Sequence, residues 1–228
     1  MTPPDIRPKA GLGVLHLFLK TGPRTDGGAV LAAVKGAEAA GTQVVTFAVL
    51  GHKADIGVMA LSPELWALRE LQSALQRAGL AAADSYVSLT EVSEYAAGMP
   101  DEMKRPRLYP ELPPEGKQAY CFYPMSKRRN PGANWYELPY EEREELMKGH
   151  GKTGRTFSGK VLQLITGSTG LDDWEWGVTL FAAGPDDLKE VVYTMRYDEA
   201  SARYAEFGPF YTGLVAPIAE VLAATGVG

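Results

Sequence analysis

Three histidines, His16, His52 and His150, are the residues of this sequence whose type most readily suggests metal or acid–base chemistry. His16 falls in an apolar run and His52 in a turn, where a structural or solvent-exposed role is the more common one. His150 lies between Gly149 and Gly151, which leave space beside its ring, at the end of an expected helix. It is either a favourable cation near a helix C-terminus or an imidazole metal ligand, and a lone histidine suits a haem iron better than zinc.

A run of aromatic and cationic residues, YCFYPMSKRR at 120–129, is the second candidate. In an extended strand the side chains alternate between faces, so Cys121, Tyr123 and Met125 share one face. A tyrosine and a methionine on such a face are either part of the core or directed at a ligand. The three consecutive cations at 127–129 are either a solvated turn or receptors for carboxylates, which arginine binds in bidentate pairs. The spacing leaves both alternatives open.

The segment TMRYDEASARYAEF is the third candidate. In it Arg196 lies near Asp198, Glu199 and Arg203, and mutual ion pairing is the simplest interpretation. Ser201 could cap the segment that follows it or donate a hydrogen bond to a ligand. The sequence has no P-loop, no GxSxG elbow and no HExxH motif. The residues themselves therefore predict an anionic ligand near one histidine and no more specific chemistry.

Two successive β-α-β-β-α-β patterns must position these residues. In the first half, apolar runs predict four strands and two helices, at 12–19, 27–40 (helix), 43–50, 55–61, 63–78 (helix) and 86–92. In the second half, the same order is predicted at 118–125, 139–148 (helix), 160–166, 174–182, 185–196 (helix) and 203–212, with a terminal helix at 214–224.

This repeat predicts an α+β fold made of two ferredoxin-like halves. We expect an N-terminal half at 1–98, a proline-rich irregular linker at 99–117 and a C-terminal half at 118–228. Sheets that face each other would form a dimeric α+β barrel covered by helices. The candidate residues fall mainly in the C-terminal half.

Composition narrows the class of protein. The chain has 228 residues, 45% hydrophobic and 22% charged, as is ordinary for a globular protein. Apolar runs fall short of the roughly 20 residues of a membrane-spanning helix, and residues 1–10 lack the apolar core of a secretory signal. The single cysteine, Cys121, excludes an internal disulfide, and a net charge of −5 argues against broad nucleic-acid binding. We expect a cytoplasmic protein without membrane or nucleic-acid partners.

Four longer motifs together resemble the chlorite dismutase superfamily and, within it, the coproheme decarboxylase branch, the hydrogen-peroxide-dependent haem synthases. They are FYPMSKRR, NWYELPYEEREELMKGHGKTGR, ITGSTGLDDWEWGVTLF and MRYDEASARYAEFGPFY. The resemblance covers nearly the whole chain and implies two ferredoxin-like halves in a homopentamer. It implies that hydrogen peroxide drives oxidative decarboxylation of two propionates of iron-coproporphyrin III (coproheme), which gives protohaem (haem b). The substrate iron is then the redox centre, and no other metal is needed.

The resemblance also implies roles for individual residues. His150 resembles the proximal iron ligand. Tyr123 resembles the tyrosine that becomes a radical and abstracts hydrogen from a propionate β-carbon. Lys127 resembles the lysine beside the reacting propionate, which it could hold and supply with a proton. Tyr136, in NWYEL, is the alternative candidate for the radical tyrosine.

Arg107, Arg196 and Ser201 resemble groups that anchor propionates, and Met125 resembles a methionine near a vinyl-forming edge. The stretch that follows Arg107 is longer than in the family pattern, so this assignment requires a gap. Gln163 falls where this branch has a distal glutamine. Chlorite-degrading members have an arginine there, so Gln163 argues against chlorite dismutation.

Two other functions share features with this one. A non-catalytic haem-binding or haem-transfer protein would have no use for an oxidisable phenol at Tyr123. A dye-decolourising haem peroxidase would need an aspartate or arginine over the iron, which Gln163 fits poorly. The implied partners are coproheme and hydrogen peroxide as substrates, with a transient contact to coproporphyrin ferrochelatase.

Overall fold

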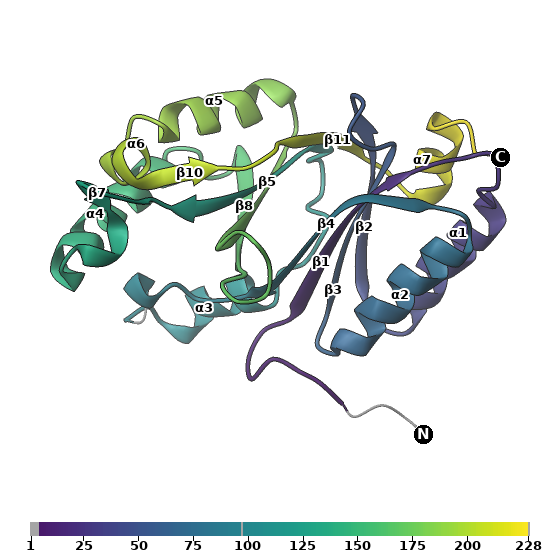
Figure 1. Cartoon of the computed structure of the whole chain (residues 1–228), viewed down its shortest axis with the longest axis horizontal. Coiled ribbons are helices and arrows are strands. Elements are labelled where there is room, and N and C mark those ends of the chain that lie inside the picture. Colours follow the sequence, from purple (N-terminus) through teal and green to yellow (C-terminus); the bar gives the residue numbers. More distant parts are fainter. Residues whose placement is uncertain (1–4, 97, 228) are drawn as a thin grey trace.

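A computed structural model describes residues 5–96 and 98–227 of the chain. Figure 1 shows two groups of helices on either side of a central set of strands. Helices α1, α2 and α7 lie on the right of that view, and α4, α5 and α6 lie on the left. Among the described residues, none of the helices has both the length and the apolar character needed to cross a membrane.

The first half of the chain folds as the expected β-α-β-β-α-β unit. Its elements are β1 (Gly13–Lys20), α1 (Gly27–Ala39), β2 (Gln43–Leu50), β3 (Ile56–Ser62), α2 (Leu65–Arg77) and β4 (Ala81–Thr90). The strands lie in the order β2-β3-β1-β4, and neighbouring strands are antiparallel. This connectivity is that of a ferredoxin-like unit.

The second half repeats this strand order with additional short elements. In chain order they are β5 (Ala119–Lys127), β6 (Arg129–Asn130), β7 (Ala133–Asn134), η2 (Trp135–Glu137), α4 (Tyr140–Arg155), β8 (Val161–Gly167), β9 (Trp176–Ala182), α5 (Pro185–Met195), α6 (Glu199–Tyr204), β10 (Ala205–Phe207), β11 (Tyr211–Val215) and α7 (Ile218–Ala224). The longer strands lie in the order β11-β5-β9-β8.

The two sets of strands join into one sheet that closes on itself. Strand β4 pairs with β8, β11 pairs with β2, and β5 pairs with both β11 and β9. The pairings therefore run in a ring, with β10 as an extra strand beside β5. The predicted α+β class is confirmed, and the ring gives the sheet one inner and one outer face.

Strand alternation divides the core between these two faces. On β1, Leu15, Leu17 and Leu19 pack outward against α1, α2 and α7, whereas Val14 and Phe18 belong to a separate inner cluster. The inner cluster is rich in aromatic rings, and Phe18 stacks on Tyr211 with their centroids 3.6 Å apart. Because α7 is the last element of the chain but packs on the first half, both ends of the sequence contribute to one core.

His16 is fully buried and stacks on Phe122 of the inner cluster, as the structural interpretation predicts. Burial lowers the pKa of the ring to about 3, so the imidazole is neutral at ordinary pH. Its Nε2 atom lies 3.1 Å from Thr179 Oγ1. His16 therefore belongs to the packing of the sheet and is separated from the helix-covered outer face. His52 is exposed in the turn between β2 and β3, as its sequence context predicts.

Two predicted segments differ from the structure. The linker expected to be irregular contains helix α3 (Asp101–Leu108), with acidic residues in its first turn and Arg105 and Arg107 in its last. These charges favour a helix through its dipole, although Pro106 lies inside it. The strand expected at 203–212 is instead the end of α6 followed by β10 and β11. Asp198 caps α6, and this local hydrogen bond outweighs the β-propensity of the aromatic residues that follow.

Gly57 is a position where the inner packing requires glycine. It pairs with Phe47 on β2, and a Cβ atom at Gly57 would overlap the Phe47 ring. Gly57→Ala should lower the free energy of unfolding by about 1–3 kcal/mol through overpacking. Gly36→Ala is the matched control, since Gly36 lies inside α1 with open space around it. That change should stabilise the protein by about 0.5–1 kcal/mol in urea unfolding, and equal effects of the two changes would contradict this explanation.

Candidate functional site

Strand β5 presents its two faces to two different environments. Tyr120 and Phe122 belong to the inner aromatic cluster, whereas Cys121 and Tyr123 pack outward with residues of α5. The predicted alternation is confirmed, and Lys127 has the same parity as Tyr123. The candidate residues of β5 therefore lie on the outer face of the ring, under the helices of the second half.

His150 lies inside helix α4, which extends to Arg155, whereas the sequence predicts an end near residue 148. The Nδ1 atom of His150 lies 3.1 Å from Asp198 Oδ2 and 3.5 Å from Ser201 Oγ. Ser201 is buried, and the His150 side chain is half-buried. The contact to Asp198 occupies Nδ1 and leaves Nε2 as the ring nitrogen that is available to a metal.

Asp198 connects two elements of the site. Its Oδ1 atom accepts a hydrogen bond from the Ser201 backbone N–H at 3.3 Å, which caps α6, while its Oδ2 atom contacts His150. Burial by itself would raise the pKa of Asp198, but the hydrogen bonds from His150 and Ser201 outweigh it and lower the pKa below the ordinary value. Asp198 is therefore an ionised partner that orients the His150 ring.

Lys127 is a buried cation on the same face of β5. Its Nζ atom donates to the Ala200 carbonyl at 3.1 Å and lies 4.2 Å from the centroid of the Trp135 ring. Burial lowers the pKa of Lys127 to about 8, against the attraction of Asp198 and Glu175. An ammonium group with such a pKa can both hold an anion and release a proton near neutral pH.

Glu175 fixes the backbone at this lysine. The buried Glu175 carboxylate accepts a hydrogen bond from the Lys127 backbone N–H at 2.8 Å and forms an ion pair with Arg129. The Arg129 guanidinium also lies over the ring of Tyr136, 4.9 Å from its centroid. Arg129 therefore takes part in an ion pair with Glu175. The run of three cations in the sequence could not predict this role, because a solvated turn would have the same composition.

Tyr123 is held by aromatic rings. Its ring stacks on Phe210 with centroids 4.4 Å apart and meets the edge of Phe207 at 5.7 Å. Burial raises the pKa of Tyr123, with a smaller opposing effect of the Arg196 charge, so the phenol stays protonated. Arg196 itself lies at the end of α5, 5.5 Å from the Phe207 ring centroid.

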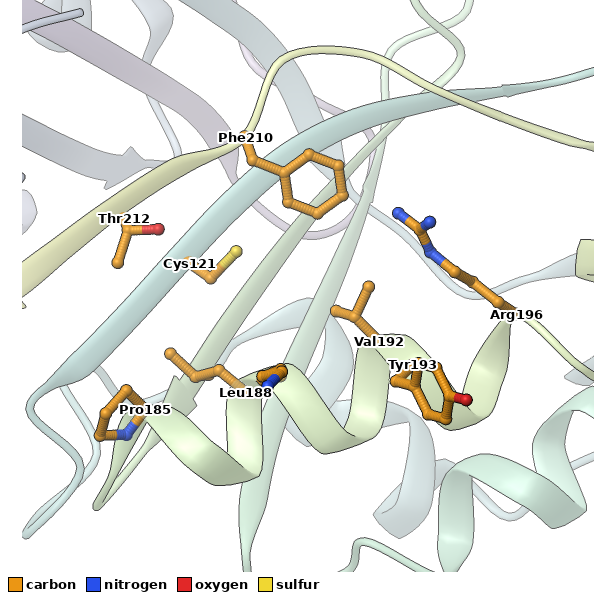
Figure 2. Close-up of a pocket in the computed structure, with 9 residues that line it drawn as sticks. Cys121, Pro185, Leu188, Val192, Tyr193, Arg196, Phe210 and Thr212 are labelled. Atoms are coloured by element: carbon orange, nitrogen blue, oxygen red, sulfur yellow. The ribbon is translucent and has the colours of Figure 1, made fainter. Parts of the chain in front are cut away.

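A cavity of about 340 Å³ adjoins this aromatic group. Figure 2 shows it between α5 and the outer face of β5 and β11, with Phe210 on one side and the Arg196 guanidinium facing it. Cys121 and Thr212 line the strand side, and Val192 and Tyr193 line the α5 side. Phe210 and Arg196 thus connect the cavity to Tyr123, whereas His150 is not among its lining residues.

The remaining candidates lie at different distances from this centre. Gln163 is exposed on β8. Its Oε1 atom faces Gly154, which lies one turn beyond His150 on α4, and a Cβ atom added to Gly154 would be 3.9 Å from it. Met125 packs at the edge of the outer cluster that includes Tyr123. Arg107 lies apart on the exposed surface of α3, where it contacts Met99.

The sequence does not reveal the partners of His150 and Lys127. It predicts that Asp198 pairs with neighbouring cations, but the ion pair within this segment joins Glu199 and Arg203, at 2.9 Å. The spacing of Asp198 and Ser201 is that of a helix cap and could have identified the start of α6. The contact of Trp135 with Lys127 has no signal in the sequence, because it depends on the β6–β7 hairpin, which brings the Trp135 backbone N–H back to the Arg128 carbonyl.

The family model described as "Chlorite dismutase" matches residues 25–216, which include all these side chains. This chain belongs to the chlorite dismutase family. The resemblance found in the four motifs is therefore confirmed at the level of the family.

Several named relatives match most of the chain. The protein called coproheme decarboxylase in Staphylococcus saprophyticus is 49% identical over 175 residues, which cover 72% of this chain and 70% of that protein. Its counterpart in Staphylococcus carnosus is 49% identical over 179 residues, covering 74% and 71%. A Natronomonas pharaonis protein, whose name provisionally assigns it heme binding, is 48% identical over 73% of this chain, but the match spans only 30% of that longer protein.

Solved structures agree with the fold. A heme-binding protein from Thermus thermophilus superposes with a TM-score of 0.84 and 38% identity, covering 98% of both chains. Chlorite dismutase from Candidatus Nitrospira defluvii superposes with a TM-score of 0.76 over 96% of both chains, at 19% identity. This second likeness supports the fold alone.

The lowered pKa of Lys127 predicts how stability depends on pH. Because the folded pKa of about 8 lies below the ordinary 10.5, the unfolded chain binds more protons between these values. The free energy of unfolding should therefore gain up to about 3 kcal/mol from this group as the pH rises from 8 to 10.5. The free energy of unfolding, measured with urea, should rise more steeply with pH over this interval for wild type than for Lys127→Met. Lys152→Met, which changes an exposed lysine of α4, is the control and should follow wild type. Parallel curves for Lys127→Met and wild type would contradict the assignment.

Proposed function

We propose that this protein is a coproheme decarboxylase, which uses hydrogen peroxide to convert two propionates of iron-coproporphyrin III into vinyl groups and releases haem b. The observation that carries the proposal is the juxtaposition of His150, held by Asp198, with Lys127, held by Ala200, through one short helix. The two staphylococcal relatives with this name, each 49% identical, support it.

The chemistry of the donor set fits a porphyrin iron. A histidine that ligates a metal commonly has its other ring nitrogen bonded to a carboxylate, which fixes the ring and raises its basicity. His150 has this arrangement, because its Nδ1 contacts Asp198 and its Nε2 is left for the iron. We assign His150 as the proximal ligand of the substrate iron and Gln163 to the opposite, distal side.

Tyr123 is assigned as the residue that abstracts hydrogen from a propionate β-carbon. The bound iron supplies, with peroxide, the oxidising equivalents. The phenol is protonated and enclosed by Phe207 and Phe210. A protonated phenol in a dry aromatic setting suits transfer of a hydrogen atom, since water is kept away from the reactive group.

Lys127 is assigned two tasks: it holds the carboxylate of the reacting propionate, and it supplies the proton that the reaction consumes. Each propionate, CH₂CH₂COO⁻, reacts with one hydrogen peroxide and one proton to give CH=CH₂, carbon dioxide and two waters. The reaction therefore consumes a proton, and Lys127, with its pKa of about 8, can supply it near neutral pH. The same ammonium group attracts the carboxylate before reaction.

An acidic protein needs local cations to bind a substrate with four propionates. We assign Arg196 to a propionate near the Tyr123–Phe207–Phe210 rings and Ser201 to a propionate near His150. We assign Met125 to the edge of the porphyrin. Arg107 would take part only if α3 approached the site, because it lies on the exposed surface.

The wider setting is also proposed. The protein would act in the cytoplasm as a homopentamer and contact coproporphyrin ferrochelatase transiently to receive its substrate. Within each subunit we propose that residues 1–98 form a scaffold, 99–117 connect the halves, and 118–228 carry the site. A carrier that only binds haem is the alternative, since two of the similar proteins are named for heme binding.

Tyr123→Phe tests the enzymatic role against the carrier role. The variant keeps the ring packing on Phe210, so coproheme binding should be unchanged, but decarboxylation should fall at least about 100-fold because the abstracting group is gone. The measurement is mass spectrometry of the porphyrin after peroxide is added. Tyr136→Phe, on the exposed alternative tyrosine, is the control and should keep its activity. The opposite pattern would transfer the role to Tyr136, and full activity of both variants would remove Tyr123 and Tyr136 from the mechanism.

A further inference from the structure

Arg143 of α4 and Tyr95 of η1 (Glu94–Ala96) form a pair of polar groups about two turns before His150. The half-buried positions of this helix include Arg143, Leu146, Met147 and His150, which have the spacing of a single helix face. His150 lies seven positions after Arg143, which places the two residues about 10 Å apart along the helix. The face that presents His150 therefore also presents Arg143.

Arg143 has a buried donor that is not bonded. Its Nε atom is inaccessible to solvent and has no hydrogen-bond partner among the described residues. Its Nη2 atom lies 3.9 Å from Glu94 in η1 (Glu94–Ala96), a carboxylate that is largely exposed, so this ion pair is weak. The guanidinium also lies 5.8 Å from the Tyr140 ring centroid. In the described part of the chain, the Nε donor thus remains free for an acceptor from a ligand.

Tyr95 brings a second free donor to the same place. It stacks on Tyr140 with centroids 5.7 Å apart, and its hydroxyl is likewise buried without a partner among the described residues. Burial, followed by the neighbouring Glu94 carboxylate, raises the pKa of Tyr95 to about 12, with the Arg143 charge opposing it, so the hydroxyl keeps its proton. A buried donor without a partner is unfavourable, and two neighbouring ones call for a shared acceptor.

An apolar cluster around Trp135 connects Arg143 and Tyr95 to Lys127. Tyr95 packs with Leu146 and Met147 against an apolar cluster that contains Trp135. Trp135 is the ring that Lys127 Nζ contacts, so the two free donors and Lys127 adjoin one apolar cluster.

We propose that Arg143 and Tyr95 together bind one carboxylate of the porphyrin substrate, as an anchor in addition to Lys127 and Arg196. The proposal rests on the proposed function, since it takes its ligand class from that substrate. The carboxylate accepts from Arg143 Nε and from the Tyr95 hydroxyl, while Arg143 Nη2 stays beside Glu94. Arginine suits this task because its planar fork can serve two acceptors at once.

The test compares two forms of one porphyrin, iron-coproporphyrin III and its tetramethyl ester, which differ only in their carboxylates. Spectral titration gives the Kd of each for wild type, Arg143→Met, Tyr95→Phe and the double variant. For the free acid, each single variant should raise Kd at least about tenfold, and the double variant should lose less than the product of the two, because both donors serve one group. For the ester, the variants should match wild type.

Tyr140→Phe is the matched control, because it removes a hydroxyl from the ring stacked on Tyr95 and should leave both Kd values unchanged. Equal losses for acid and ester would show general damage to the site and overturn the anchor. Unchanged Kd values for the free acid would show that the two donors hold water instead. Both results differ from failure of the proposed function, in which wild type itself would not bind coproheme.

Discussion

The hydrogen bonds of Asp198 are the interaction on which the candidate site depends. One carboxylate oxygen caps α6 and the other orients His150, so the cap of a six-residue helix is also the support of the proposed iron ligand. The Ala200 carbonyl of the same helix receives Lys127. A helix this short has no stability of its own in water, so its position comes from these contacts and from the packing of Ala200 and Tyr204 on Trp135. The proposed ligand and proton donor are therefore positioned by one element and would move together.

The closed sheet supplies the rigid side of this arrangement. Strand β5 pairs with β9, β10 and β11, and its inner residues are locked into an aromatic cluster. Its outer residues, Tyr123 and Lys127, are thereby held at fixed spacing beneath α5 and α6. The proposed chemistry lies on the outer face because the inner face is filled: Tyr120, Phe122 and His16 leave it no room for a ligand of porphyrin size.

Periodicity in the sequence predicts most of the fold, and it fails where local and non-local effects compete. The apolar runs of β1, β2 and β3 and the helical stripe of α2 lie within a few residues of their predicted places. The strands are packed on both faces of the sheet and the helix on one, so burial determines these elements. The segment 203–212 has the composition of one strand, but the Asp198 cap begins a helix that runs into it. The prolines around helix α3 predict a loop, whereas its charge order favours a helix.

The candidate site divides in the same way. His150, Tyr123 and Lys127 could be selected from the sequence because their motifs resemble a family, and Gln163 could be placed by the same means. Their partners could not, since the contacts His150–Asp198 and Lys127–Trp135 join residues that are distant in the chain or folded over by a hairpin. The family resemblance implies no role for Tyr95 or for Arg143, although Arg143 lies within one of the four motifs. Only the burial of their unpaired donors makes the two residues visible.

The most direct test of the central claim follows the substrate of the unmodified protein. Iron-coproporphyrin III is bound to wild type, hydrogen peroxide is added in steps, and the porphyrin is analysed by mass spectrometry. We expect stepwise loss of two carboxyl groups and the appearance of haem b. Tight binding of coproheme without any change in its mass would contradict the decarboxylase assignment and favour a haem carrier.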